Sequence, residues 1–173
     1  QSLNQITCKT IEGLVLDFQN WRPDLVLVQG DTTSAFSAAL ASFNEKIPVG
    51  HIEAGLRTDN ILEPFPEEAN RRLISQIASI HFAPTSNSCE NLRKSNVTGD
   101  IHLTGNTVID ALNYMSNKNL KLSLEGISDN KIKIILMTIH RRENWGRNIE
   151  QIINGILKVL NKNEDVKLLL PMH

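Results

Sequence analysis

Pro48-Val-Gly-His-Ile-Glu-Ala-Gly-Leu-Arg-Thr58 and, after a loop, Pro66-Glu-Glu-Ala-Asn-Arg-Arg72 form the stretch around which the chain is organised. An apolar strand ends here in the polar side chains of His51, Glu53 and Arg57, and a helix then opens on two more carboxylates. A short strand-to-helix connection ordinarily needs a glycine and a capping residue, not a carboxylate at the strand tip. The stretch is therefore predicted to form one wall of an active site.

Outward from this stretch, helical and strand patterns alternate along the chain. Apolar residues at helical spacing predict helices over 3–18, 33–44, 66–78, 86–94, 107–117 and 149–160. Short apolar runs predict strands over 25–28, 48–52, 81–84, 101–104, 132–138 and 166–170. Strict alternation with short loops predicts parallel sheets with right-handed crossovers, a doubly wound α/β fold. The continuous apolar run 25–28 is expected to be covered on both faces.

Residues 118–131 differ in character from the rest, because Asn, Lys, Ser, Gly and Asp dominate there. This composition predicts a linker between a first domain over 1–117 and a second over 132–173. The chain lacks an initiating Met, begins within a helical pattern and ends just after a strand. We therefore expect it to be a piece of a longer protein.

Composition narrows the function classes. The chain has 173 residues, of which 40% are hydrophobic and 21% charged, as in an ordinary globular protein. Its net charge of −1 argues against binding of nucleic acid or an acidic membrane. No apolar run approaches the roughly 20 residues of a membrane span. A reduced, cytoplasmic setting is the default for two distant cysteines, Cys8 and Cys89.

No cofactor or metal is indicated by the motifs. The sequence has neither a Walker loop nor a Gly-x-Gly-x-x-Gly run, so ATP or NAD use is not supported. It has no clustered His and Cys ligands. His51 and His81 lie inside strands, where a satisfied core histidine is the more common reading.

Polar groups gather where the predicted strands end. Asp31 follows strand 25–28, Glu53 ends strand 48–52, and His140 follows strand 132–138. Ligands of parallel α/β sheets bind beyond the carboxyl ends of the strands. These three residues are therefore candidates for a site.

Each carboxylate also has an ordinary structural explanation. Asp31 suits a turn or a helix cap. Glu53 suits a buried ion pair with Arg57; if it is functional, burial and neighbouring charge would tune it as an acid or base. Glu67 and Glu68 suit the positive end of a helix dipole, with Pro66 as the first helical residue.

The loop after strand 132–138 is basic. It carries His140, Arg141, Arg142 and Arg147 just before helix 149–160. Arginine side chains and a helix N-terminus suit a phosphate or diphosphate, although a solvated charged loop is the alternative. The residues alone thus predict an α/β protein that binds an anionic, phosphorylated ligand near carboxylates.

Five motifs in register resemble the bacterial non-hydrolysing UDP-N-acetylglucosamine 2-epimerases. They are Pro23-Asp-Leu-Val-Leu-Val-Gln-Gly-Asp-Thr-Thr33, Pro48 to Thr58, Pro66-Glu-Glu-Ala-Asn-Arg71, Thr104-Gly-Asn-Thr-Val-Ile-Asp110 and His140-Arg-Arg-Glu-Asn144. The resemblance implies a GT-B-like fold of two Rossmann-like domains with the active site in the cleft between them. It places the later part of the first domain at 1–117, the linker at 118–131 and the start of the second domain at 132–173.

The family interconverts UDP-GlcNAc and UDP-ManNAc for cell-surface polysaccharide precursors. Its route eliminates UDP to give 2-acetamidoglucal and then adds UDP back with C2 inverted. By this resemblance, Asp31, Glu53 and Glu67 are essential catalytic carboxylates. His140 is also catalytic and contacts the diphosphate region, and Arg142 binds substrate. Which carboxylate takes the C2 proton stays open.

Further features follow from the same resemblance. Arg141 and His173 match positions of a second, regulatory UDP-GlcNAc, and a homodimer is expected. The chain departs from the family at Gln29, where His is usual. The family's N-terminal Gly-Thr-Arg-Pro-Glu motif and its later uridine-gripping segment are absent, so the chain alone is expected to be inactive.

Two alternatives remain. One is a related enzyme, either the hydrolysing type that releases ManNAc and UDP or an epimerase of a diacetamido sugar. The other is an inactive UDP-sugar-binding remnant.

Overall fold

A computed structural model describes residues 1–118, 132–139 and 146–171 of the chain. By its internal contacts the chain divides into two compact units, residues 1–119 and residues 120–173. The predicted linker, 118–131, falls almost entirely outside the described residues, so its boundaries stay a prediction.

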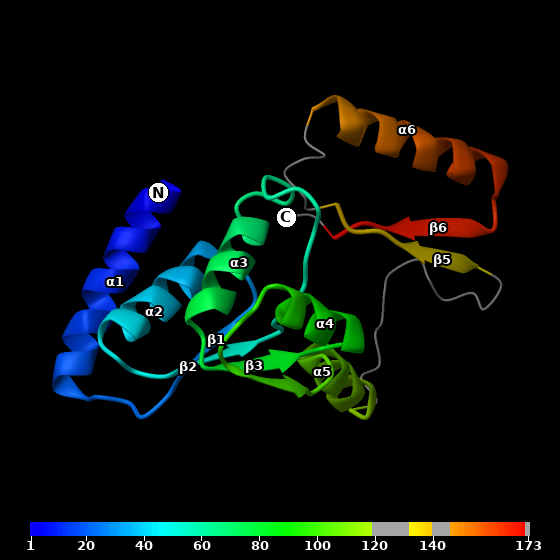
Figure 1. Cartoon of the computed structure of the whole chain (residues 1–173). Helices are drawn as coiled ribbons and strands as arrows, with labels where there is room; N and C mark the ends of the chain where they lie inside the picture. Colours follow the sequence, from blue (N-terminus) through cyan, green and yellow to red (C-terminus); the bar gives the residue numbers. More distant parts are fainter. Residues whose placement is uncertain (119–131, 140–145, 172–173) are drawn as a thin grey trace. The chain divides into compact units, whose positions relative to one another are not determined.

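The first unit alternates helices and strands as the sequence predicts (Figure 1). Its elements are α1 (Leu3–Asn20), β1 (Val26–Gln29), α2 (Thr33–Asn44), β2 (Val49–Ile52), α3 (Glu67–Ile77), β3 (Ile80–Ala83), α4 (Ser86–Lys94), β4 (Asp100–Leu103) and α5 (Thr107–Ser116). Helix α4 matches its predicted range, and the strands β3 and β4 each begin one residue earlier than expected. All four strands are parallel and lie in chain order, β1-β2-β3-β4.

Most helices of this unit begin at a capping side chain. Ser2 caps α1 in a capping box with Gln5, and Thr85 and Asn106 cap α4 and α5. The Thr32 hydroxyl accepts a hydrogen bond from the Ala35 N–H at the start of α2. Helix α3 differs from the prediction, because Pro66 is its N-cap rather than its first helical residue and provides no side-chain cap.

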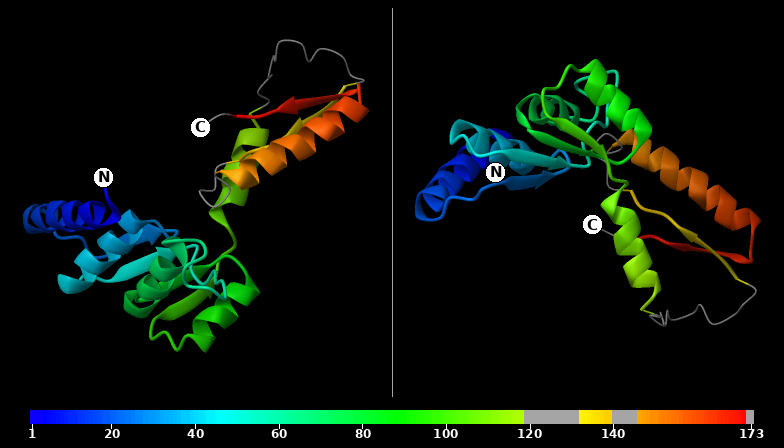
Figure 2. Two further views of the ribbon diagram at one scale, coloured as in Figure 1. Left: turned by 90° about the horizontal axis from the view of Figure 1, so that it is seen from above. Right: turned by 60° about the horizontal axis from the view of Figure 1, so that its bottom comes forward.

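The core lies on the face of the sheet covered by α2, α3 and α4. Val28 and Val49 pack there with Ala39 of α2 and Ile74 of α3. The small side chains of α2 allow close contact with the neighbouring α1 and α3, and α1 lies beside α2 in both Figure 1 and Figure 2.

The opposite face of β1 is not covered by any of the residues that the structure describes. Leu27 is 56% exposed and Leu25 is 39% exposed, whereas Val28 is buried. The expectation that run 25–28 is covered on both faces is therefore wrong here. The physical reason is the strand order, because right-handed crossovers between strands in chain order place their helices on one face.

The second unit is a β-α-β element. Strand β5 (Lys133–Leu136) and strand β6 (Val166–Leu169) are parallel, and α6 (Arg147–Lys162) connects them. The helix is two residues longer at each end than the predicted 149–160. In the described parts of the chain, no helix is both long and apolar enough to cross a membrane.

Gly55, which follows β2, is fixed by the close approach of α4. Its φ is +87°, and a Cβ at this position would overlap the carbonyl oxygen of Ser88. Its own carbonyl accepts a hydrogen bond of 3.0 Å from Asn91 Nδ2. Only glycine adopts this positive φ at low cost and also leaves room for the Ser88 carbonyl.

Replacement of Gly55 by alanine should therefore destabilise the protein. We expect Gly55→Ala to lower the free energy of unfolding by about 2 kcal/mol or more, from backbone strain and overlap. The matched control is Gly13→Ala in α1, where a Cβ meets no atom within 4 Å and a gain of about 1 kcal/mol is expected. Urea denaturation measures the free energy of unfolding of both variants. Equal effects of the two changes would show that the close approach of α4 to Gly55 does not require glycine.

Candidate active site

Three predicted carboxylates lie at the carboxyl-end side of the first unit's sheet. Asp31 follows β1, Glu53 follows β2, and Glu67 is the first residue of α3. The hydrogen bond from the Gly30 N–H to the Ile52 carbonyl, 3.0 Å long, joins the ends of β1 and β2. The sequence pattern thus correctly placed Asp31 and Glu53 on neighbouring strand ends.

Glu53 lines a cavity of about 530 Å³. The other lining residues are Gln29 from the end of β1 and four residues around the start of α5: Asn106, Thr107, Val108 and Ala111. Gln29 Nε2 lies 3.5 Å from the Thr107 hydroxyl, which it reaches as a donor. Among the described residues of this lining, Glu53 is the only acidic one, and its carboxylate can accept a proton from a bound molecule.

The backbone of Glu53 is in the left-handed region, with φ of +68°. A non-glycine residue with this φ is uncommon and typical of turns and functional sites. The expected ion pair with Arg57 does not form in the described structure. Arg57 donates instead to the Leu56 carbonyl at 2.8 Å and to the Ser75 hydroxyl at 3.0 Å.

Asp31 is held by α3 rather than acting as a cap. Its Oδ2 accepts a hydrogen bond of 2.8 Å from Arg71 Nε, and its carbonyl accepts one of 2.8 Å from Asn70 Nδ2. Because Thr32 provides the cap of α2, the turn-or-cap explanation does not account for the Asp31 side chain. The ion pair fixes the carboxylate in one orientation.

Glu68 lies behind this ion pair. Its side chain is fully buried, and its two oxygens accept hydrogen bonds from Arg71 Nη1 at 3.1 Å and Arg72 Nε at 2.8 Å. The helix-dipole explanation of Glu68 did not predict this pairing, and the contacts of Asn70 and Arg71 with Asp31 were not predicted either. A usable signal was present, because Glu68 stands three and four residues before two arginines on one helix.

Glu67 differs from its neighbour. Its Oε2 is buried and has no hydrogen-bond partner among the described residues. Buried polar atoms in proteins are nearly always paired, so an unpaired carboxylate oxygen calls for an explanation beyond the helix dipole. A donor on a bound ligand would satisfy it.

His51 and His81 are buried on neighbouring strands, opposite each other in the β2–β3 register. His51 Nε2 lies 2.8 Å from the Gly30 carbonyl, to which it donates, and so supports the turn that carries Asp31. Burial lowers the pKa of His51 and lowers the pKa of His81 to about 4, with smaller contributions to the latter from His51 and Arg57. Both are core histidines as expected, but neither is fully satisfied. Among the described residues, His51 Nδ1 and both ring nitrogens of His81 have no partner.

Four predicted site residues lie outside the described residues: His140, Arg141, Arg142 and His173. The structure therefore does not test their roles. Within the part of the chain that is described, no three His, Cys, Asp or Glu residues are grouped so as to hold a metal ion.

Removal of Arg71 should destabilise the protein, because the buried carboxylate of Glu68 loses a partner. We expect Arg71→Leu to lower the free energy of unfolding by about 3 kcal/mol, because Glu68 loses one of two cationic partners and Asp31 loses its own. The control is Glu90→Gln, which breaks the exposed Lys94–Glu90 pair of 3.9 Å and should cost about 0.5 kcal/mol or less. Urea denaturation at pH 7 measures both, and a loss of no more than the control's would show that the network adds no stability.

Because His81 is buried, we expect the protein to lose stability in mild acid. Its folded-state pKa of about 4 lies below the unfolded value of 6.5, so the unfolded state binds the proton first. The free energy of unfolding is therefore unaffected by His81 protonation above pH 6.5. It falls as the pH falls from 6.5 toward 4, by on the order of 3 kcal/mol in total.

Replacement of His81 by leucine should flatten this pH dependence. The free energy of unfolding of His81→Leu and of the parent, measured in urea at pH 7 and pH 5, gives the comparison. The exposed His102 offers the matched change, His102→Leu, which should leave the dependence as in the parent. A parallel decline in all three proteins would rule out His81 as its source.

The comparisons with known proteins cover the whole chain. The family model for UDP-N-acetylglucosamine 2-epimerase matches residues 1–173. The chain is 47% identical over 182 residues to the curated UDP-N-acetylglucosamine 2-epimerase of Neisseria meningitidis, covering 100% of this chain and 49% of that protein. It is 43% identical over 182 residues to the one of Escherichia coli K12, covering 100% and 48%.

A solved structure agrees with these sequence matches. The crystal structure of UDP-GlcNAc 2-epimerase from Neisseria meningitidis bound to UDP-GlcNAc superposes with a TM-score of 0.92 at 43% identity, covering 100% of this chain and 49% of that one. The expected α/β fold with Rossmann-like parallel sheets of the GT-B type is thereby confirmed. The chain spans about half the length of the curated relatives it matches.

Proposed function

Because the chain belongs to the UDP-N-acetylglucosamine 2-epimerase family, we propose that its protein interconverts UDP-GlcNAc and UDP-ManNAc without net hydrolysis. The observation that carries the proposal is the set of three carboxylates at one sheet edge, with Glu53 facing a cavity of about 530 Å³. The Neisseria relative that superposes on this chain was crystallised with UDP-GlcNAc.

The chemistry requires acid and base groups beside the sugar. The C2 hydrogen of the substrate is not next to a carbonyl, so direct removal and return of the proton is unfavourable. Elimination breaks the C2–H and C1–O bonds, forms a C1=C2 double bond, and leaves the electron pair on the departing UDP. Re-addition of UDP with proton delivery to the other face of C2 gives the epimer.

The three carboxylates suit different parts of this reaction. Glu53 lines the cavity and is our candidate for proton transfer at the sugar. Glu67 has a buried, unpaired oxygen that can accept a hydrogen bond from a sugar hydroxyl or amide. Asp31 is fixed by Arg71, which suits a positioning role or a second proton carrier of defined orientation.

The remaining assignments rest on family resemblance. We propose that His140 and Arg142 bind the diphosphate of the substrate, where cationic groups stabilise the departing UDP. Arg141 and His173 are proposed to contact a second, regulatory UDP-GlcNAc. We also retain as proposals the domain limits 1–117 and 132–173, a homodimer, a cytoplasmic location and a role in polysaccharide precursor synthesis.

The direct test uses the purified protein with UDP-GlcNAc in D2O, followed by proton NMR. Formation of UDP-ManNAc with deuterium at C2 is the expected result, because the eliminated proton exchanges with solvent. Release of free ManNAc and UDP would assign the hydrolysing type instead. An unchanged spectrum from a full-length, folded and ligand-binding protein would overturn the proposal.

Glu53→Gln should abolish most of the activity without unfolding the protein. The amide keeps the size of the side chain but cannot take a proton, so we expect turnover to fall about 100-fold to 10,000-fold. Initial rates of UDP-ManNAc formation measure the loss, and circular dichroism checks the fold. Glu63→Gln, in the exposed part of the loop before α3, is the control and should keep parental rates; near-parental turnover by Glu53→Gln would remove Glu53 from the mechanism.

A further inference from the structure

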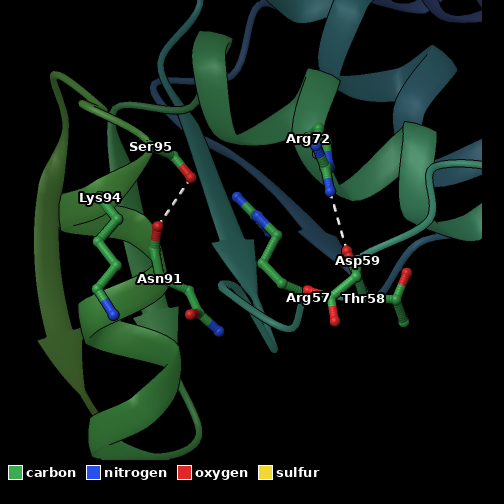
Figure 3. A pocket seen from close by; sticks show the side chains of 7 residues that line it. All are labelled: Arg57, Thr58, Asp59, Arg72, Asn91, Lys94 and Ser95. Atoms are coloured by element: carbon green, nitrogen blue, oxygen red, sulfur yellow. Dashed lines mark hydrogen bonds between the residues drawn. The ribbon is translucent and has the colours of Figure 1, made fainter.

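A second cavity of the first unit lies between α3, α4 and the loop that follows β2 (Figure 3). Its volume is about 220 Å³, and its lining includes Arg57, Arg72 and Lys94 with one carboxylate, Asp59. It shares no lining residue with the cavity at Glu53. We propose that this cavity binds the phosphate group of a small molecule, independently of the epimerase reaction.

Arg57 carries a charge without an ion-pair partner among the described residues. Its guanidinium donates only to neutral acceptors, the Leu56 carbonyl and the Ser75 hydroxyl. Across the described residues, no carboxylate lies within ion-pair distance of it. Burial lowers the pKa of Arg57, and the charge of Glu68 opposes this shift only in part. A half-buried cation without an anion is costly, and a bound anion would relieve that cost.

Two carboxylates near the cavity, Asp31 and Glu68, are already engaged by other arginines. Glu68 is shared by Arg71 and Arg72, and Asp31 pairs with Arg71. These two carboxylates pair with the two arginines of α3, and neither forms an ion pair with Arg57. Within the described ranges, the ion pair of Lys94 is an exposed contact of 3.9 Å with Glu90, which competes weakly with a ligand.

The walls of the cavity are tied together by hydrogen bonds between separate segments. Asn91 Nδ2 donates to the Gly55 carbonyl at 3.0 Å, and Arg72 Nη2 donates to the Thr58 carbonyl at 2.9 Å. Gln76 of α3 donates to the Ser95 carbonyl, at the end of α4, at 3.2 Å. Figure 3 shows the Arg57 side chain lying between the α4 residues and Arg72. A ligand therefore meets a cavity that is already formed, which reduces the ordering cost of binding.

The donors specify the class of ligand. Guanidinium groups bind phosphate oxygens in a planar fork, and an ammonium group adds a compact charge. Two features oppose an anion, namely Asp59 and the negative end of the α4 dipole. Lys94, in the last turn of α4, offsets the dipole. Asp59 repels an anion, so replacement of its carboxylate should tighten phosphate binding.

The experiment is a titration with inorganic phosphate, at constant ionic strength, followed by proton–nitrogen NMR. We expect saturable shifts of the Arg57 side-chain N–H and of the backbone amides of Lys94 and Ser95, and no such shifts with chloride. Lys94→Gln should weaken the affinity about fivefold, and Asp59→Asn should strengthen it about threefold. Arg93→Gln, an exposed charge of α4 outside the lining, should change it less than about twofold.

Several results would overturn the proposal. Shifts that fail to saturate, or that chloride reproduces, would show general screening. An equal effect of Arg93→Gln and Lys94→Gln would show long-range charge rather than a site. Shifts confined to Asn106 and Thr107, at the other cavity, would place the phosphate there. Because the two cavities share no residue, loss of the proposed epimerase activity would not affect the outcome.

Discussion

The carboxylate of Glu68, fully withdrawn from water, bonds two guanidinium groups that reach in different directions. Through Arg71 it orients Asp31 after β1, and through Arg72 it reaches the carbonyl of Thr58 in the loop after β2. A buried carboxylate needs such partners, since its isolated charge would be too costly to desolvate. One residue in the first turn of α3 thus connects the turn after β1, the loop after β2 and the helix itself.

The three candidate carboxylates of the active site occupy three different environments. Asp31 is paired, Glu53 sits on strained backbone at a cavity, and Glu67 holds a buried oxygen without a partner among the described residues. A reaction that both removes and returns a proton needs groups that are not interchangeable. The three carboxylates differ because their surroundings differ, and not because their side chains are of different chemical types.

Much of the first unit could be predicted because its signals are local. Helical periodicity, strand runs and Thr32 as a cap depend on a few consecutive residues, and the strand order then brings Asp31 and Glu53 to one edge. The helix dipole favours both first-turn carboxylates alike. It could not predict that Glu68 is buried between two arginines while Glu67 has an oxygen without a described partner. Which of two adjacent residues is buried depends on how the helix packs on its sheet. The unsatisfied nitrogens of His81 depend likewise on neighbours distant in sequence.

The chain-order sheet also bears on how the protein emerges from the ribosome. Each new strand from β2 to β4 pairs with the strand synthesised just before it, so its partner is already outside the exit tunnel. The loops to be closed span one helix each, and the entropic cost of closing them grows only slowly with their length. Synthesis at about 5–20 residues per second is slow beside the formation of such local contacts. The four described strands of this sheet can therefore pair in the order of their synthesis during translation.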